Sequence, residues 1–160
     1  MADGTAQGVM ADGVVREIWV AAKPETVFPF FTEADQIVRW MGVEAEIDAR
    51  PGGIFRCNVT GTSIARGEMV AVDPYSRVVF TWGWEGPDAT VKPGASTIEV
   101  TLTAENDGTR VRLFHRGLSG SVAERHNHGW AHFMERLQVA ASGGDPGPDP
   151  WAKPAAAAGA

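Results

Sequence analysis

The sequence predicts a single α+β domain in which an antiparallel sheet is covered by one long helix. The chain of 160 residues, 44% of them hydrophobic, has the size and composition of one packed domain. Residues 43–116 alternate apolar and polar side chains between regularly spaced turns, which is typical of antiparallel strands. Residues 122–141 instead repeat apolar side chains every three or four positions, as does a helix with one buried face.

The two ends of the chain differ from this domain in composition. Residues 1–13 are small and polar, and residues 142–160 are rich in Gly, Pro and Ala. Neither has enough apolar surface to offset the entropy lost on ordering, so we expect disordered tails at 1–13 and 142–160 and a domain at 14–141. Trp151 is either a mobile bystander or an anchor that docks on the domain or a partner. The tail composition suggests a GC-rich bacterial genome.

The first elements are a strand and two short helices. Residues 14–21 alternate as a strand does. Pro24 marks the start of a helix, because proline at the first helical position loses no hydrogen bond. Thr32, followed three residues later by Asp35, resembles a capping arrangement and predicts the start of a second helix. The apolar residues of the two helices are Val27, Phe28, Phe30 and Phe31, then Ile37, Val38, Trp40 and Met41.

The middle of the chain reads as an antiparallel meander. Turn residues separate its strands at 51–53, 60–63, 73–74, 84–94 and 106–108. The alternation predicts a sheet that is exposed on one face and covered on the other. A curved sheet that wraps one helix often leaves a cavity, and we expect the function to lie there. The alternate apolar residues on four strands are Val43, Ala45, Ile47; Phe55, Cys57, Val59; Val78, Phe80, Trp82, Trp84; and Ile98, Val100, Leu102.

Five segments follow one another in a recognisable order: IWVAAKPETVFPFFTEADQIVRW, RPGGIFR, RGEMVAVDPYSRVVFTW, GTRVRLFHRGL and HNHGWAHFMERL. Together they resemble the family of activator-of-heat-shock-chaperone-ATPase homologues, in the polyketide cyclase and lipid-transfer (START-like, SRPBCC) superfamily, over about residues 14–137. The resemblance implies a helix-grip fold. Its antiparallel sheet would have six or seven strands, with two short helices after the first strand and a long C-terminal helix over a hydrophobic cavity.

The resemblance leaves the activity open, since relatives with this fold include ligand binders, cyclases, hydrolases and chaperone regulators. The eukaryotic chaperone activators resemble this chain only in their C-terminal part and use a separate N-terminal domain to engage the chaperone. This sequence lacks that domain, so a chaperone interaction is doubtful. A possible homodimer is compatible with the superfamily, although no sequence feature demands one.

Aromatic residues are the main candidates for ligand binding, because flat side chains can line a cavity and indole N–H groups can donate hydrogen bonds. Filling of the core is the alternative role for each of them. His115 and His126 are expected to face the same cavity, His115 from strand parity and His126 from the apolar stripe of the helix. The ligand-binding candidates are Trp40, Phe55, Trp82, Trp84, His115, His126, Trp130 and Phe133.

Catalytic candidates are His115, His126 and Glu68. Either histidine could exchange a proton near neutral pH. Alternatively, His115 could be a partly buried residue bonded to backbone, and His126 could have a capping or orienting role near the start of the helix. Glu68 could lie near the concave face of the sheet or face solvent. Cys57 is expected to be an inert buried thiol, since no basic residue is placed to lower its pKa.

Several function classes are disfavoured. A formal charge of -6, with 20 acidic and 14 basic residues, argues against nucleic-acid binding. Arg110, Arg112 and Arg116 describe a solvated strand face. His128 and His132 share a helical face, but such a face is usually only solvated, so we expect no metal. No cofactor motif, nucleophile elbow or calcium loop is found, and none is expected to be used.

The cytoplasm is the expected location, because there is no secretory signal, no segment long enough to insert in a membrane and only one cysteine. The first hypothesis is binding of a small hydrophobic or aromatic molecule between sheet and helix. An alternative is a cyclase- or hydrolase-type enzyme that uses a pocket histidine, and another is a protein that interacts with a chaperone or regulator. The sequence does not identify the ligand or the oligomeric state.

Overall fold

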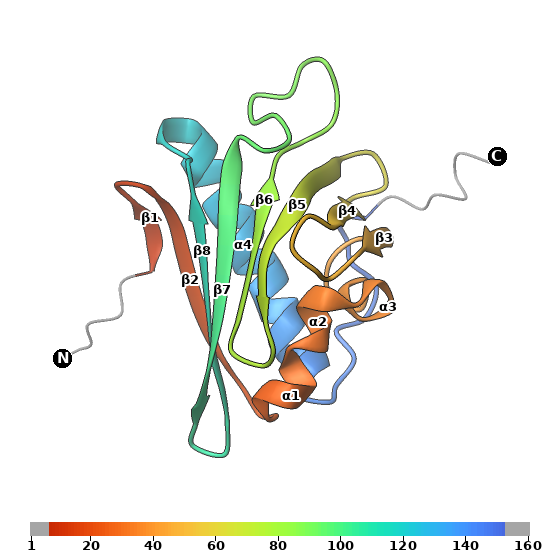
Figure 1. Ribbon diagram of the computed structural model, residues 1–160, viewed down its shortest axis with the longest axis vertical. Helices are drawn as coiled ribbons and strands as arrows, with labels where there is room; N and C mark the ends of the chain where they lie inside the picture. The colour runs from red at the N-terminus through yellow and green to blue at the C-terminus, as the bar shows by residue number, and fades with distance from the viewer. Residues whose placement is uncertain (1–6, 153–160) are drawn as a thin grey trace.

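A computed structural model describes residues 7–152, which form one antiparallel sheet, three short helices and one long helix (Figure 1). The eight strands lie in the order β1-β2-β8-β7-β6-β5-β4-β3. The strands are β1 Gly8–Met10, β2 Gly13–Val20, β3 Glu44–Ile47, β4 Ile54–Asn58, β5 Ile64–Asp73, β6 Arg77–Trp82, β7 Ser96–Glu105 and β8 Gly108–Arg116. The helices are α1 Pro24–Val27, α2 Pro29–Thr32, α3 Ala34–Ile37 and α4 Gly120–Ala141.

The sheet and the long helix form the two layers of a helix-grip-like α+β fold, as predicted. Figure 1 shows α4 crossing one face of the sheet, with α1, α2 and α3 beside its lower end. The sheet has eight strands rather than six or seven. The additional edge strand β1 pairs with β2, with Val9 opposite Val14. The prediction of disorder for residues 1–13 is therefore wrong for 8–10, because backbone pairing with an adjacent strand stabilises a segment that has little to bury; residues 1–6 lie outside the described residues.

The short helices are three rather than two. Pro24 begins α1 as predicted, and Pro29 begins α2, where its missing N–H divides what would otherwise be one helix. The predicted cap at Thr32 is wrong. Glu33 is the N-cap of α3, and the Thr32 hydroxyl instead donates to the carbonyl of Phe28 at 3.4 Å.

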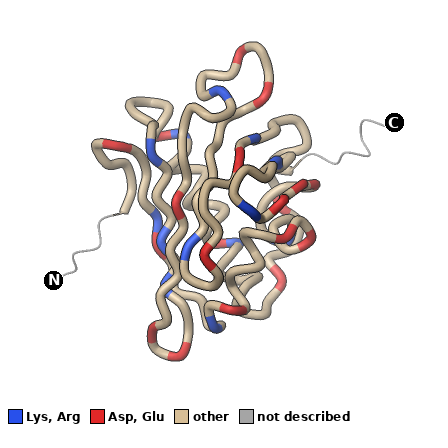
Figure 2. The backbone as a smooth tube through the Cα atoms, in the orientation of Figure 1, with Lys and Arg blue, Asp and Glu red and all other residues tan. Residues whose placement is uncertain are grey.

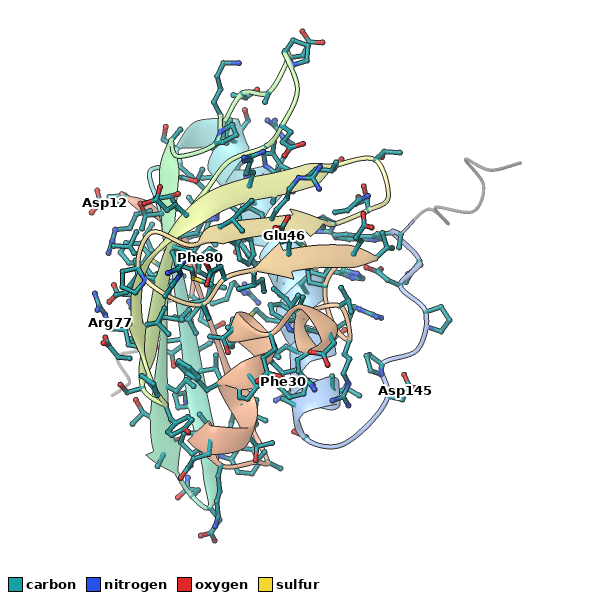
Figure 3. All side chains as sticks on the ribbon, turned by 45° about the vertical axis from the view of Figure 1, so that its right-hand side comes forward. Asp12, Phe30, Glu46, Arg77, Phe80 and Asp145 are labelled. Atoms are coloured by element: carbon teal, nitrogen blue, oxygen red, sulfur yellow. The ribbon has the colours of Figure 1, made fainter. Side chains whose placement is uncertain are left out.

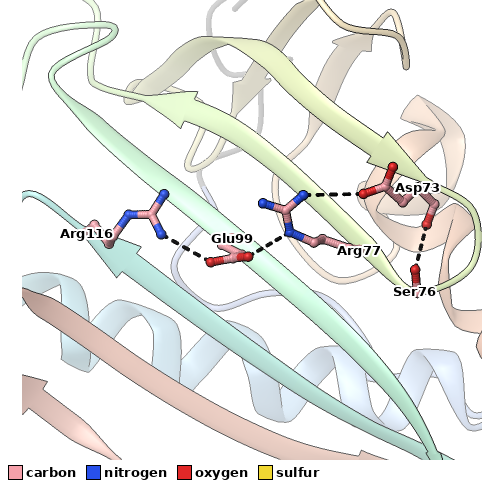
Figure 4. Close-up of polar contacts among 5 residues, drawn as sticks. All are labelled: Asp73, Ser76, Arg77, Glu99 and Arg116. Atoms are coloured by element: carbon pink, nitrogen blue, oxygen red, sulfur yellow. Dashed lines mark hydrogen bonds and ion pairs between the residues drawn. The ribbon is translucent and has the colours of Figure 1, made fainter.

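The outer face of the sheet carries charged residues in pairs. Arg77 contacts Glu99 at 2.7 Å and Asp73 at 3.3 Å, and Arg116 reaches the other oxygen of Glu99 at 3.1 Å (Figure 4). Figure 3 shows Arg77 on the outer side of the sheet, whereas Phe80, three residues later on β6, is buried. Figure 2 shows basic and acidic residues interspersed along the backbone. This face is a solvated, ion-paired surface, as predicted from the alternation of Arg110, Arg112 and Arg116.

The inner face of the sheet packs against α4 to form one hydrophobic core. The buried residues of α4 recur at helical spacing: Ala123, Trp130, Phe133, Met134, Leu137, Ala140 and Ala141. They meet Val111 and Leu113 of β8 and Ile98 and Val100 of β7 in the same cluster. None of the helices within residues 7–152 combines the length and the hydropathy needed to cross a bilayer.

Residues 142–152, here called the C-terminal strap, lie along α4 rather than being disordered as predicted. The guanidinium of Arg136 donates to the carbonyls of Pro146 and Gly147 at 3.4 and 2.9 Å. The imidazole of His132 contacts the carboxylate of Asp149 at 2.8 Å. Side chains of α4 therefore hold a strap whose own composition gave no sign of order, and residues 153–160 of the predicted tail lie outside the described residues.

Candidate ligand-binding cavity

A cavity of about 280 Å³ opens between α4, the end of β6, the turn after β4 and the C-terminal strap. This volume is near the lower end of the range found for small-molecule sites. Most of the wall is apolar or aromatic. The lining residues are Met41, Val59, Thr60, Ser63, Trp82, Trp84, Arg125, His126, Gly129, Trp130, Phe133 and Trp151.

Five aromatic rings behind and around this cavity form one packed cluster: Trp82, Trp84, His115, His126 and Trp130. The ring of Trp82 lies 5.3 Å from that of Trp84, in an edge-on arrangement, and 5.4 Å from that of Trp130. The two imidazoles stand edge to face at 5.3 Å. These separations lie in the range in which aromatic pairs attract each other, so the wall is rigid where a flat molecule would contact it.

His115 is fully buried on β8, facing inward as strand parity predicted, but it does not line the cavity. Its Nδ1 accepts the indole N–H of Trp130 at 3.0 Å, so the neutral ring carries its proton on Nε2. Nε2 donates to the hydroxyl of Ser96 at 2.8 Å, and this hydroxyl donates to the carbonyl of Trp82 at 2.8 Å. Burial, with a further effect of His126, lowers the pKa of His115 well below its ordinary value. His115 therefore lies behind the cavity and supports its wall through the hydrogen bond to Trp130.

His126 does line the cavity, on the second turn of α4. Its Nδ1 donates to the carbonyl of Val122 at 2.8 Å, and its Nε2 accepts the indole N–H of Trp84 at 3.0 Å. Burial is the main effect on the pKa of His126 and lowers it. The hydrogen bond to the carbonyl of Val122 raises this pKa, and the charge of Arg125 lowers it further. Both ring nitrogens are therefore engaged within the protein, and protonation of Nε2 would set it against the Trp84 N–H.

Three further candidates lie outside the cavity. Trp40 is buried, donates its indole N–H to the carbonyl of Phe30 at 3.0 Å and packs in the core. Phe55 stacks on Phe80 at 4.3 Å, behind Trp82. Of the two alternatives for Glu68, the structure shows the solvent-facing one: Glu68 is exposed, between the inward-facing positions of β5 and beside Gly67 at another part of the surface. Strand parity at Glu68 was ambiguous because a register irregularity follows in β5.

Seven of the twelve lining residues were not among the sequence candidates: Met41, Val59, Thr60, Ser63, Arg125, Gly129 and Trp151. A Cβ built at Gly129 would meet no atom within 4 Å, so this glycine leaves open space at the cavity. Glycine inside a helix destabilises it by about 1 kcal/mol relative to alanine. A glycine at position 129 of a predicted helix was therefore the sequence feature that could have pointed to this part of the wall. Of the two alternatives for Trp151, the structure shows the docked anchor: its ring stacks on His132 at 3.7 Å and meets the edge of Phe133 at 5.6 Å.

The polar groups of the cavity wall are few. The indole N–H of Trp82 is buried and has no hydrogen-bond partner among the described residues.

Burial raises the pKa of the Cys57 thiol to about 12, which keeps it protonated and unreactive. Within residues 7–152, no three His, Cys, Asp or Glu side chains gather as a metal site would require. His128 and His132 contact Trp151 instead.

Comparison with known proteins places this geometry in a family. A model of the family described as "Activator of Hsp90 ATPase homolog 1-like protein" matches residues 21–142. The solution structure of an AHSA1-like protein from Rhizobium etli is 41% identical, with a TM-score of 0.68, and the match covers 93% of this chain and 94% of that one. No curated protein sequence matches at a significant level.

More distant structures share the fold. DynU16, a protein of the dynemicin biosynthetic locus, is 24% identical with a TM-score of 0.76; the match covers 89% of this chain, which spans about half (51%) of the length of DynU16. The solution structure of the Aha1 dimer from Colwellia psychrerythraea is 20% identical with a TM-score of 0.70, and the match covers 82% of this chain and 97% of that one.

Proposed function

Because the chain belongs to the family of Activator of Hsp90 ATPase homolog 1-like proteins, whose helix-grip fold is typical of ligand binders, we propose that it binds a small aromatic molecule in the cavity beside α4. The observation that carries the proposal is a preformed cavity of about 280 Å³ walled by Trp82, Trp84, Trp130 and Trp151. This volume equals that of about nine water molecules at roughly 30 Å³ each. It suits a ligand of one or two rings better than a long acyl chain.

Burial of the ligand's apolar surface would drive binding. A ligand that loses about 200 Å² of apolar surface gains about 5 kcal/mol before the costs of association. The rigid aromatic wall lowers those costs because few side chains need to be ordered. A gain of about 5 kcal/mol corresponds to a dissociation constant of about 0.2 mM, so with the costs of association included we expect values of about 0.2–1 mM for simple two-ring compounds.

The arrangement of the histidines favours binding over catalysis. A general base must have a free ring nitrogen within reach of the substrate proton. His126 has its Nε2 occupied by the Trp84 N–H, and His115 has its Nδ1 occupied by the Trp130 N–H. Both are neutral acceptors of indole N–H groups, and an acid–base role would require the indole partner to move.

The indole N–H resonances of the six tryptophans provide the test. In a titration with 2-naphthol followed by ¹H–¹⁵N NMR, we expect saturable shifts at Trp82, Trp84, Trp130 and Trp151. Trp19 and Trp40 are internal controls, because their N–H groups are bonded to the carbonyls of Glu105 and Phe30 outside the cavity. Shifts confined to Trp19 and Trp40, or no saturable shift with any two-ring compound, would contradict the proposal.

A further inference from the structure

Among residues 7–152, Arg125 is the one charged side chain in the wall of the cavity. A second, smaller cavity of about 200 Å³ adjoins the first and shares Ser63, Trp84, Arg125 and His126 with it. The remaining walls of the second cavity are Ala89, Thr90, Val91 and Val122. Of the residues that the structure describes, none in either wall is a carboxylate, so the described part of the place where the two cavities meet carries one formal charge, which is positive.

Arg125 also differs from the other arginines of the chain. Among residues 7–152, each of the others takes part in an ion pair or a side-chain hydrogen bond: Arg16, Arg39, Arg50, Arg56, Arg66, Arg77, Arg110, Arg112, Arg116 and Arg136. No such contact is found for Arg125 within the part of the chain that the structure describes. In a protein with a formal charge of -6, Arg125 therefore places a cation without a carboxylate partner beside an apolar cavity.

We infer that the ligand is an anion, an aromatic carboxylate whose rings lie among the tryptophans and whose carboxylate is held by the guanidinium of Arg125. The inference rests on the proposed function, since it assigns the polar end of the same ligand. Guanidinium groups bind carboxylates through paired, charge-assisted hydrogen bonds. Arg125 is exposed, so solvent screens the attraction and the contact adds selectivity more than affinity.

A matched pair of probes tests the assignment. 2-Naphthoate and 2-naphthamide have the same shape and number of non-hydrogen atoms, but only the first is charged at neutral pH. At an ionic strength of about 0.01 M, we expect the wild-type protein to bind naphthoate about fivefold more tightly than naphthamide, as measured by calorimetry and by the indole N–H shifts. The preference should shrink towards unity at about 1 M salt.

Variants at Arg125 assign the effect to one side chain. Arg125→Gln should reduce the ratio of naphthoate affinity to naphthamide affinity to about one, whereas Arg125→Lys should keep most of the preference. Arg50→Gln removes the same charge from an exposed loop outside both cavities and should preserve the preference.

Equal binding of the two probes by the wild type, or a preference that survives in Arg125→Gln, overturns the inference while the cavity remains a binding site. If neither probe binds and the indole resonances do not move, the proposed function fails and the inference fails with it.

Discussion

Trp130 on α4 donates its indole N–H to Nδ1 of His115 on β8 across 3.0 Å, in a site where both side chains are buried. The bond joins the long helix to the middle of the sheet and continues through Ser96 to the backbone of Trp82. Every polar group in this chain of contacts has a partner. These bonds tie Trp130 on α4 and the backbone of Trp82 on β6, two parts of the cavity wall, to the same buried network.

Removal of the Trp130 donor should destabilise the fold. Trp130→Phe leaves Nδ1 of His115 buried without a donor, which costs about 1–3 kcal/mol, and the smaller ring adds a packing loss. Trp19→Phe is the matched control, because its N–H is bonded to the carbonyl of Glu105 in a partly buried site. Urea denaturation should show a clearly larger loss for Trp130→Phe, and equal losses would contradict the account of the network.

The two lowered histidine pKa values predict the pH dependence of stability. In the unfolded chain, each histidine binds a proton as the pH falls through its ordinary pKa of 6.5, whereas in the folded protein burial lowers the pKa of His115 and of His126, so that each ring binds its proton only at lower pH. The unfolded state then binds more protons, so the free energy of unfolding falls as the pH drops below about 6.5, by up to about 1.4 kcal/mol per pH unit for each histidine. Above that pH, the contribution is fully present.

Denaturant midpoints measured at intervals between pH 7.5 and pH 5 test this prediction. Carboxylates with lowered pKa values, such as Glu99, change the free energy of unfolding only below their ordinary pKa of 4.5. The change between pH 7.5 and pH 5 is therefore assigned to the histidines. His115→Gln should reduce the slope in the same window. A midpoint that stays constant or rises on acidification would contradict the neutral, buried state of these rings.

The C-terminal strap should contribute to both stability and ligand binding. Trp151→Ala removes the ring stacked on His132 and opens one side of the cavity, so we expect a loss of about 1 kcal/mol of stability and weaker binding of 2-naphthol. Tyr75→Ala is a control that removes an exposed ring packed on Phe28 outside the cavity. Affinity that falls equally in both variants would exclude a specific role of the strap.

The sequence predicted the fold better than the site. Periodicity located α4 and the strands, since helical and strand repeats differ clearly, and parity placed His115 inward. Parity could not tell that His115 lies behind the wall, because depth depends on the hydrogen bond to Trp130 across the sheet–helix interface. The sequence does not decide the position of Trp151 for a similar reason: its contacts with His132 and Phe133 join segments whose pairing no local pattern encodes.

Gly129 should show a conflict between stability and function. Because a Cβ at this position meets no atom within 4 Å, Gly129→Ala gains helix propensity without a clash and should stabilise the fold by about 1 kcal/mol. Thermal denaturation measures this gain. A lower melting temperature for Gly129→Ala would show that the space beside α4 is not open.

Binding of 2-naphthol by Gly129→Leu, measured by calorimetry beside the wild type and Gly129→Ala, tests the central claim most directly. The leucine side chain would occupy the cavity from α4 while the core network of His115 stays intact. We predict a folded Gly129→Leu protein, at least as stable as the wild type, that binds 2-naphthol at least about tenfold more weakly, with Gly129→Ala between the two. A folded Gly129→Leu protein that binds with wild-type affinity would contradict the claim that this cavity is the ligand site.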